Sequence, residues 1–278
     1  MSQTKPHLSE NLYLDAGFVL REGEPSGQER ADLGALFATN LRKTRSFDDP
    51  ARFLLADTLE KCSRRHRCRL AACPQCAHAF QRWAHEQALE VLAPLGPVAT
   101  LTYIPAGLQR SPGALAKLRM DTAARHVRRK FHEAGISDLH AVGFFDISLN
   151  IHAEGEWDPV FQPHAAFLMP AQEVHRVSAA LRTLAKTQRS SPWVQQQVKR
   201  PIRQDAVIDQ AYQGSYVFKW RPVKNTWFEA WSPHANPTEQ WLQPKQQVEV
   251  LLWLGDHPPQ ARMINCGIGR CGQSLKWL

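Results

Sequence analysis

The sequence predicts an α+β fold in which helices flank an antiparallel sheet, with a small cysteine-rich element attached. One observation is the order of the central segments between residues 98 and 187, which is strand, helix, strand, strand, helix. Another is a cluster of cysteines between residues 62 and 76. The chain has 278 residues, of which 43% are hydrophobic and 22% charged, so it can bury a sizeable core.

The N-terminal part is expected to hold an arm and then a helical element that binds metal. Residues 1–50 are mostly polar and are expected to form an N-terminal arm. Residues 51–61 and 80–92 place apolar side chains at helical spacing and predict two helices. Because the cysteine cluster lies between them, the range 51–95 is expected to be a helical zinc-binding element.

Residues 96–230 are expected to form the core, with elements that follow from alternation and helical periodicity. They are a strand over 98–104, a helix that opens at 111–113 and ends near 134, a strand over 140–152, a returning strand over 163–169 and a helix over 171–187. The apolar run over 248–254 predicts a late buried strand. Residues 231–278 are therefore expected to be a C-terminal extension that packs on the core.

The charge balance favours a polyanionic partner such as DNA. Lysine and arginine number 34 against 26 acidic residues, which gives a net charge of +8. No apolar run approaches the length of about 20 residues that spans a bilayer, and the N-terminus lacks the pattern of a signal peptide. A cytoplasmic protein without a membrane partner is therefore expected, and in that compartment cysteines favour metal ligands or buried thiols over disulfides.

Cysteines with the spacing C-x5-C-x4-C-x2-C predict a structural zinc site. They are Cys62, Cys68, Cys73 and Cys76. Four thiolates suit tetrahedral Zn²⁺, although His66 or His78 could replace one of them, and four free thiols are the alternative. A second close pair, Cys266 and Cys271, could hold another metal, join the first site or remain two thiols.

Arginines interleave this cluster and predict contacts with DNA phosphates, against the alternative of a solvated charged loop. They are Arg64, Arg65, Arg67 and Arg69. A further stretch alternates cations with indoles and could stack bases along a single strand, although a packed aromatic corner explains it equally well. Its candidate contacts are Trp220, Arg221 and Lys224.

Two tyrosines predict a nucleophilic site. In the segment Tyr212-x3-Tyr216-x2-Lys219 the tyrosines are four residues apart, so on a helix they share one face, and Lys219 follows one turn later. A phenol beside a cation and a polarised phosphate can attack DNA and hold it covalently. The alternative is a pair of half-buried packing residues.

The order of these motifs resembles the rolling-circle replication initiators of plasmids and phages, which belong to the HUH endonuclease superfamily. The resemblance covers about residues 50–225. The segment LADTLEKCSRRHRCRLAACPQCAHAFQRW is similar to a cysteine-rich element before the nuclease core, and Thr100-Leu101-Thr102 is similar to the first motif. The segment Glu156-Trp157-Asp158-Pro159-Val160-Phe161-Gln162-Pro163-His164 resembles the approach to the second, and the tyrosine segment matches the two-tyrosine form of the third.

This resemblance implies an HUH nuclease core in which a His-hydrophobic-His pair and a carboxylate hold Mg²⁺ or Mn²⁺. A tyrosine then attacks the scissile phosphate and leaves a 3′ hydroxyl that primes synthesis. The chain departs from the pattern because it reads His164-Ala165-Ala166, with alanine in place of the second histidine. The remaining candidate ligands are His164 together with Asp146 and His152 on the preceding strand.

The expected function is therefore a nickase that acts on origin duplex and single-stranded DNA, with Tyr216 favoured over Tyr212 because Lys219 follows it. The chain lacks a phosphate-binding loop of the Gly-x4-Gly-Lys-Ser/Thr type, so a separate helicase and the host replication machinery would act with it. Two alternatives remain. One is a DNA-binding protein with weak or absent nicking activity, which Ala166 favours, and the other is a related mobile-element transposase.

Overall fold

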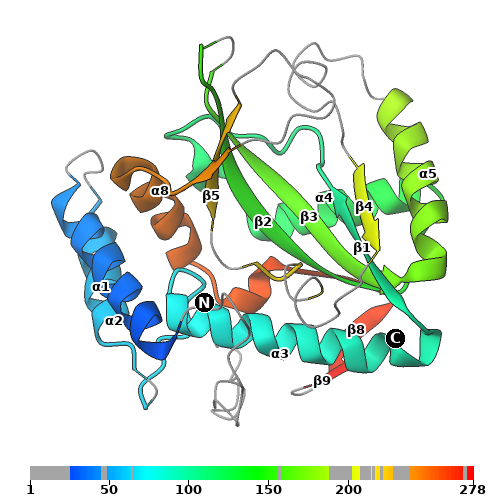
Figure 1. Cartoon of the computed structure of the whole chain (residues 1–278), viewed down its shortest axis with the longest axis horizontal. Helices are drawn as coiled ribbons and strands as arrows, with labels where there is room; N and C mark the ends of the chain where they lie inside the picture. The colour runs from blue at the N-terminus through cyan, green and yellow to red at the C-terminus, as the bar shows by residue number, and fades with distance from the viewer. Residues whose placement is uncertain are drawn as a thin grey trace, which may run out of the picture.

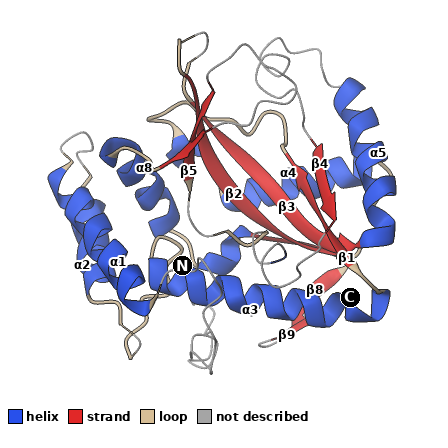
Figure 2. Ribbon diagram, in the orientation of Figure 1, coloured by secondary structure: helices blue, strands red, loops and turns tan. Residues whose placement is uncertain are grey.

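The computed structural model describes residues 26–44, 49–63, 65–155, 158–187, 202–206, 214, 217–219, 222–227, 238–271 and 274–278. This part of the chain is a mixed α+β structure, in which a curled sheet carries helices along its faces and a helical group at one side (Figures 1 and 2). The expected fold class is confirmed at this level.

The strands of the sheet pair mostly antiparallel, and many of the paired strands are distant in sequence. Its strands are β1 (Val98–Tyr103), β2 (Ala141–His152), β3 (Val160–Pro170), β4 (Ile202–Ala206), β5 (Val223–Trp227), β6 (Thr238–Gln240) and β7 (Met263–Cys266). The order is β4-β1-β3-β2-β5-β6, and β7 also pairs with β2. The β2–β5 pair is parallel, and the other pairs in this sheet are antiparallel. The long β2–β3 pair is therefore central and fixes which side chains meet.

Helices cover both faces of this sheet. Helix α3 (Pro74–Leu92) lies on one face, and α4 (Met120–Glu133) and α5 (Ala171–Thr187) lie on the other. The helical group at the side consists of α1 (Gly27–Lys43), α2 (Ala51–Glu60) and α8 (Pro244–Gly255). Alternation sends Phe145 and Phe167 into the core with α4 and α5, and it sends Phe144 to the opposite face. There the Phe80 ring of α3 stacks on Phe144 with centroids 5.9 Å apart. We call this second face the α3 face.

The first helix corrects the expectation of an irregular arm over residues 1–50. Residues 1–25 lie outside the described part, but residues 27–43 form α1. The Ser26 hydroxyl accepts the N–H of Glu29 at 3.1 Å, and the Glu29 carboxylate accepts the N–H of Ser26 at 2.6 Å. This capping box starts the helix, and Phe37 and Leu41 are buried one turn apart against the helical group.

The predicted strand over 248–254 is wrong, because these residues belong to α8. Gln243 caps the helix together with Gln246, and Pro244 occupies the first turn, where its missing N–H costs no hydrogen bond. The helix packs against α1 and α2 on one side and against a 3₁₀ turn over Leu115–Lys117 on the other. A helix buried on several sides has no polar stripe, so its sequence resembles that of a buried strand.

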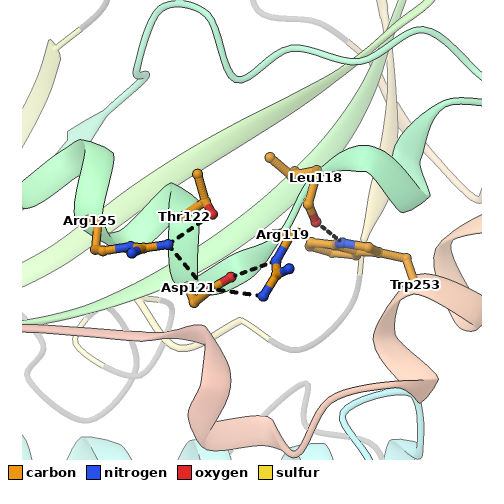
Figure 3. A network of polar contacts seen from close by, with 6 residues as sticks. All are labelled: Leu118, Arg119, Asp121, Thr122, Arg125 and Trp253. Atoms are coloured by element: carbon orange, nitrogen blue, oxygen red, sulfur yellow. Dashed lines mark hydrogen bonds and ion pairs between the residues drawn. The ribbon is translucent and has the colours of Figure 1, made fainter.

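Buried polar groups tie α8 to the start of α4. The Glu249 carboxylate accepts the N–H of Gly113 at 2.8 Å and of Leu115 at 2.9 Å. The Trp253 indole donates to the carbonyl of Leu118 at 2.7 Å, beside the exposed ion pairs of Asp121 (Figure 3). The prediction that this helix opens at 111–113 is therefore wrong: α4 begins at residue 120, and the residues before it form turns that Glu249 holds.

The other expected elements of the core are confirmed. β1, β2, β3 and α5 lie where alternation and helical periodicity placed them, and Gly135 ends α4 with a φ of +72°. A separate hairpin of β8 (Ile268–Cys271) and β9 (Ser274–Trp277) ends the described chain. Among the helices of the described residues, none combines the length and apolarity needed to span a membrane.

Candidate metal centre and polar sheet face

The four cysteines of the predicted zinc site converge at the start of α3. Cys62 follows α2, Cys68 lies in the loop, Cys73 is the residue before α3 and Cys76 is in its first turn. The Cys62 sulfur lies 3.4 Å from that of Cys73 and 3.6 Å from that of Cys76, and the Cys68 and Cys76 sulfurs are 3.7 Å apart. The four sulfurs all lie within 4.8 Å of one another.

This geometry fits a tetrahedral metal. A zinc ion with sulfur ligands at about 2.3 Å keeps those sulfurs about 3.8 Å apart, which is close to the observed separations. The thiols interact so closely that hydrogen bonds from Cys68, Cys73 and Cys76 lower the pKa of the Cys62 thiol. The cluster could therefore hold a metal such as zinc. The group that could hold a metal consists of the four cysteine sulfurs, and neither His66 nor His78 belongs to it.

The loop between the cysteines is held by backbone and amide contacts. The N–H of Arg69 donates to the Cys76 sulfur at 3.3 Å, and Arg69 takes a φ of +60°. Arg67 donates to the Gln75 side chain at 2.9 Å, so its guanidinium braces the loop. Arg65 is exposed, and Arg64 lies outside the described residues. Among the described arginines of this loop, Arg65 and Arg69 therefore remain predicted phosphate contacts.

A row of polar side chains occupies the α3 face of the central strands. Asp146 on β2 lies directly opposite His164 on β3. The Ser148 hydroxyl is 3.1 Å from His164 Nε2, and it also lies 3.4 Å from the Asn150 side-chain oxygen, which accepts from Asn225 at 3.1 Å. Ser148 is only 1% exposed, which excludes it as a nucleophile toward DNA despite its histidine neighbour.

His164 is held as a neutral imidazole on this face. Burial lowers its pKa, the nearby Asp146 carboxylate opposes this shift, and the Lys219 ammonium adds to the lowering. A neutral imidazole is the form that binds a metal or accepts a hydrogen bond.

The tyrosine segment approaches the same face where it is described. Tyr212 and Tyr216 lie outside the described residues, but Val217 and Phe218 are buried in the core of the α3 face. The Phe218 ring meets Phe144 edge to face with centroids 6.0 Å apart. A methyl group added at Gly214 would lie 2.8 Å from His85 Nε2 of α3, so glycine permits this close approach. Gly214, Val217 and Phe218, the described residues of this segment nearest to Tyr216 in sequence, therefore border the α3 face.

Lys219 ends this segment as a mostly buried cation. Its ammonium lies 3.5 Å from the Glu239 carboxylate of β6, and its side chain is 14% exposed. Trp220 and Arg221 lie outside the described residues, and Lys224 is half-buried on β5. The carbonyl of Lys219 and the carboxylate of Asp146 both contact one nitrogen of Arg262, at 3.2 and 3.5 Å.

His152 does not join the predicted metal ligands, which corrects that expectation. It shares a face of β2 with Asp146, but six residues of extended strand separate them by about 20 Å. Its register partner is Trp227 of β5, beyond the end of the β2–β3 pairing. Alternation predicts which side chains share a face and says nothing about how far apart they lie. In the described chain, no group of three or more potential ligands other than the cysteine cluster meets closely enough for a metal.

The alanine in place of the second histidine has a clear position. Ala166 lies opposite Phe144 on one side and Thr102 of β1 on the other, on the same face as His164. Strand β3 therefore offers a single imidazole to this face.

The second cysteine pair stays apart from the metal cluster, with Cys266 half-buried on β7 and Cys271 exposed on β8. Burial raises the pKa of Cys266 to about 11, so its thiol stays protonated and unreactive at neutral pH.

Sequence reasoning missed Arg262, the buried cation beside this row. It lies 3.5 Å from Asp146, and no motif in the sequence marks it, because its position depends on how the segment after α8 folds back onto β2.

Comparison with known proteins adds no relative: no protein-family model, curated protein or solved structure matches the chain.

Proposed function

We propose that this chain nicks one strand of DNA through Tyr216 and starts rolling-circle replication from the free 3′ end. The observation that carries the proposal is that Asp146 and His164 lie opposite each other on the α3 face, while one nitrogen of Arg262 contacts both Asp146 and the carbonyl of Lys219. The described residues nearest to Tyr216 in sequence border the same face. A nucleophile, an imidazole, a carboxylate and a cation would then converge, as phosphoryl transfer requires.

The chemistry assigned to these residues is a transesterification. The phenolic oxygen of Tyr216 forms a bond to phosphorus, the bond from phosphorus to the 3′ oxygen breaks, and the released oxygen takes a proton. Lys219 stabilises the phenolate and the charge that develops on the phosphate, because a cation favours both. His164 and Asp146 would meet the phosphate through a divalent ion, because a carboxylate and a phosphate repel each other directly. The product is a 5′-phosphotyrosine and a free 3′ hydroxyl.

His164 and Asp146 would also hold the divalent ion of such a reaction. They lie opposite each other on neighbouring strands, and they supply one nitrogen and one carboxylate. Mg²⁺ commonly binds through one or two carboxylates together with substrate phosphates and water, so a small protein donor set fits this ion. When bound, the ion would polarise the scissile phosphate.

The cysteine cluster is assigned a structural zinc ion and a part in DNA docking. Closed four-cysteine sites stabilise folds and perform no chemistry. The exposed Arg65 and the half-buried Arg69 extend from the metal-held loop and would contact phosphates. The chain would dock on origin duplex and take up single-stranded DNA, with a separate helicase unwinding the nicked duplex.

The experiment is a covalent capture. The protein is incubated with Mn²⁺ and single-stranded DNA from the replicon that carries its gene, and the products are separated on a denaturing gel. A protein–DNA band is expected for the wild type, and Tyr216→Phe should abolish it. Tyr103→Phe is the matched control, because Tyr103 is buried on the opposite face of β1 beside Phe131. This control should keep the band.

A second candidate is a protein that binds an origin or operator without nicking it. Ala166 is the observation that favours it. Even the loss of a residue that only supports a metal ligand lowers metal affinity or activity by about 10- to 100-fold, so the loss of a ligand itself lowers them by orders of magnitude. The same gel decides between the two candidates. If candidate origins give no covalent band but are bound tightly without metal, the binding protein is correct and the nickase is not.

A further inference from the structure

Arg262 is a fully buried cation beside the polar row of the α3 face. It ends a short 3₁₀ helix over Pro259–Arg262 and is 1% exposed. Burial lowers its pKa to about 10, although the nearby Asp146 carboxylate opposes the shift. The guanidinium therefore stays protonated at neutral pH. A buried charge is costly unless hydrogen bonds and counter-charges compensate it, so the contacts it makes are informative.

One guanidinium joins three segments that are distant in sequence. Its Nε donates to the carbonyl of Phe145 on β2 at 2.7 Å. Its Nη2 donates to the carbonyl of Lys219 at 3.2 Å and lies 3.5 Å from Asp146 Oδ1. Its central carbon sits 4.3 Å from the centroid of the Phe144 ring. The same nitrogen thus reaches the end of the tyrosine segment and the carboxylate opposite His164.

We infer that Arg262 is a positioning residue that fixes the tyrosine segment relative to the Asp146–His164 pair. Its planar guanidinium holds Nε toward the carbonyl of β2 and Nη2 toward the Lys219 carbonyl and Asp146 in one fixed geometry, whereas the ammonium of a flexible lysine has no such fixed arrangement of donors. By holding the Lys219 carbonyl it fixes the described end of that segment, Val217–Lys219, and by pairing with Asp146 it orients the carboxylate. This inference rests on the proposed function for its catalytic consequence, while the positioning itself is measurable without activity.

The first test measures hydrogen exchange of the full-length protein. In Arg262→Met, which keeps the bulk but removes the charge and donors, amides of a peptide containing Val217–Lys219 should exchange about tenfold faster. Peptides from α5 should exchange as in the wild type. Arg176→Met is the matched control, because Arg176 pairs with Asp138 and Glu173 on the exposed side of α5. If Arg262→Met is folded and exchange over Val217–Lys219 is unchanged, the inference is overturned.

The second test separates positioning from general stability. In Arg262→Lys, which keeps a charge near Asp146, the first-order rate of covalent adduct formation should fall about 100-fold, because small misplacements of reacting groups cost this much. DNA affinity and the melting temperature should stay close to wild type. If Arg262→Lys reacts at the wild-type rate, the inference is overturned. If the wild type forms no adduct, the proposed function fails, while the exchange result still decides whether Arg262 holds the segment.

Discussion

Replacing one cysteine of the metal cluster is the most direct perturbation of the helical element. In Cys76→Ser the change removes a sulfur that is fully buried, that lies 3.6 and 3.7 Å from two partner sulfurs and that accepts the Arg69 N–H. A metal held by the cluster cross-links Cys62 to Cys76. We expect this variant to lose the ion and, with it, the restraint that joins α2 to α3.

The magnitude follows from the length of the loop that the metal closes. A cross-link across a loop of about 15 residues, as between Cys62 and Cys76, removes chain entropy worth about 3 kcal/mol from the unfolded state. For a chain of this size that loss lowers the melting temperature by about 6 to 12 °C. Structural zinc binds with about 10 to 16 kcal/mol in small zinc domains, so the loop estimate is a lower bound.

The assay combines metal analysis of the purified protein with thermal unfolding. The wild type should carry one zinc ion per chain, and Cys76→Ser should carry little. Cys271→Ser is the matched control, because Cys271 is exposed on β8, and this variant should keep the metal and change stability by less than about 0.5 kcal/mol. A metal-free wild type, or a Cys76→Ser protein that melts at the wild-type temperature, would refute the reasoning.

Three further predictions concern a structural carboxylate, the pH dependence of stability and DNA contacts. Glu249→Gln should lower the free energy of unfolding by about 2 kcal/mol in urea titrations, because the carboxylate accepts two backbone N–H groups, of which that of Leu115 is buried; an unchanged unfolding midpoint would contradict this. Burial lowers the pKa of His126, His164 and His257 in the folded state. As the pH falls below about 6.5, the unfolded chain therefore binds more protons than the folded chain, and the protein should be less stable at pH 5 than at pH 7. His164→Gln should reduce that difference in stability, and an equal or larger difference would argue against a buried neutral His164. Arg65→Ala should weaken DNA binding and lower the slope of log affinity against log salt by about 1, whereas an unaltered slope would remove Arg65 from the interface.

The sequence was sufficient to predict much of the fold where periodicity was strong. Alternation located β1, β2 and β3, and the spacing of the cysteines predicted the four-sulfur cluster. The strand predicted over 248–254 failed because α8 is buried on several sides, so its helical period is hidden by apolar residues. Helix α1 was missed because polar residues surround its few buried positions, although Ser26 and Glu29 form a capping box visible in the sequence.

The candidate site was predictable only in part. The pairing of Asp146 with His164 follows from a hairpin of two long strands, and the structure bears it out. His152 was misplaced because a shared face was taken for proximity. Arg262 could not be found, because its role depends on tertiary contacts between three distant segments rather than on any local pattern. Local signals thus predicted the strands, and long-range packing determined the polar site.

The most direct measurement of the central claim is the identity of the residue that carries nucleotide after the reaction. The reacted protein is digested with nuclease and protease, and the modified peptides are sequenced by mass spectrometry. The account predicts a nucleotide 5′-phosphate linked to Tyr216, and its yield should fall sharply in His164→Ala. Nucleotide found on some other side chain, or a yield that does not depend on His164, would contradict it.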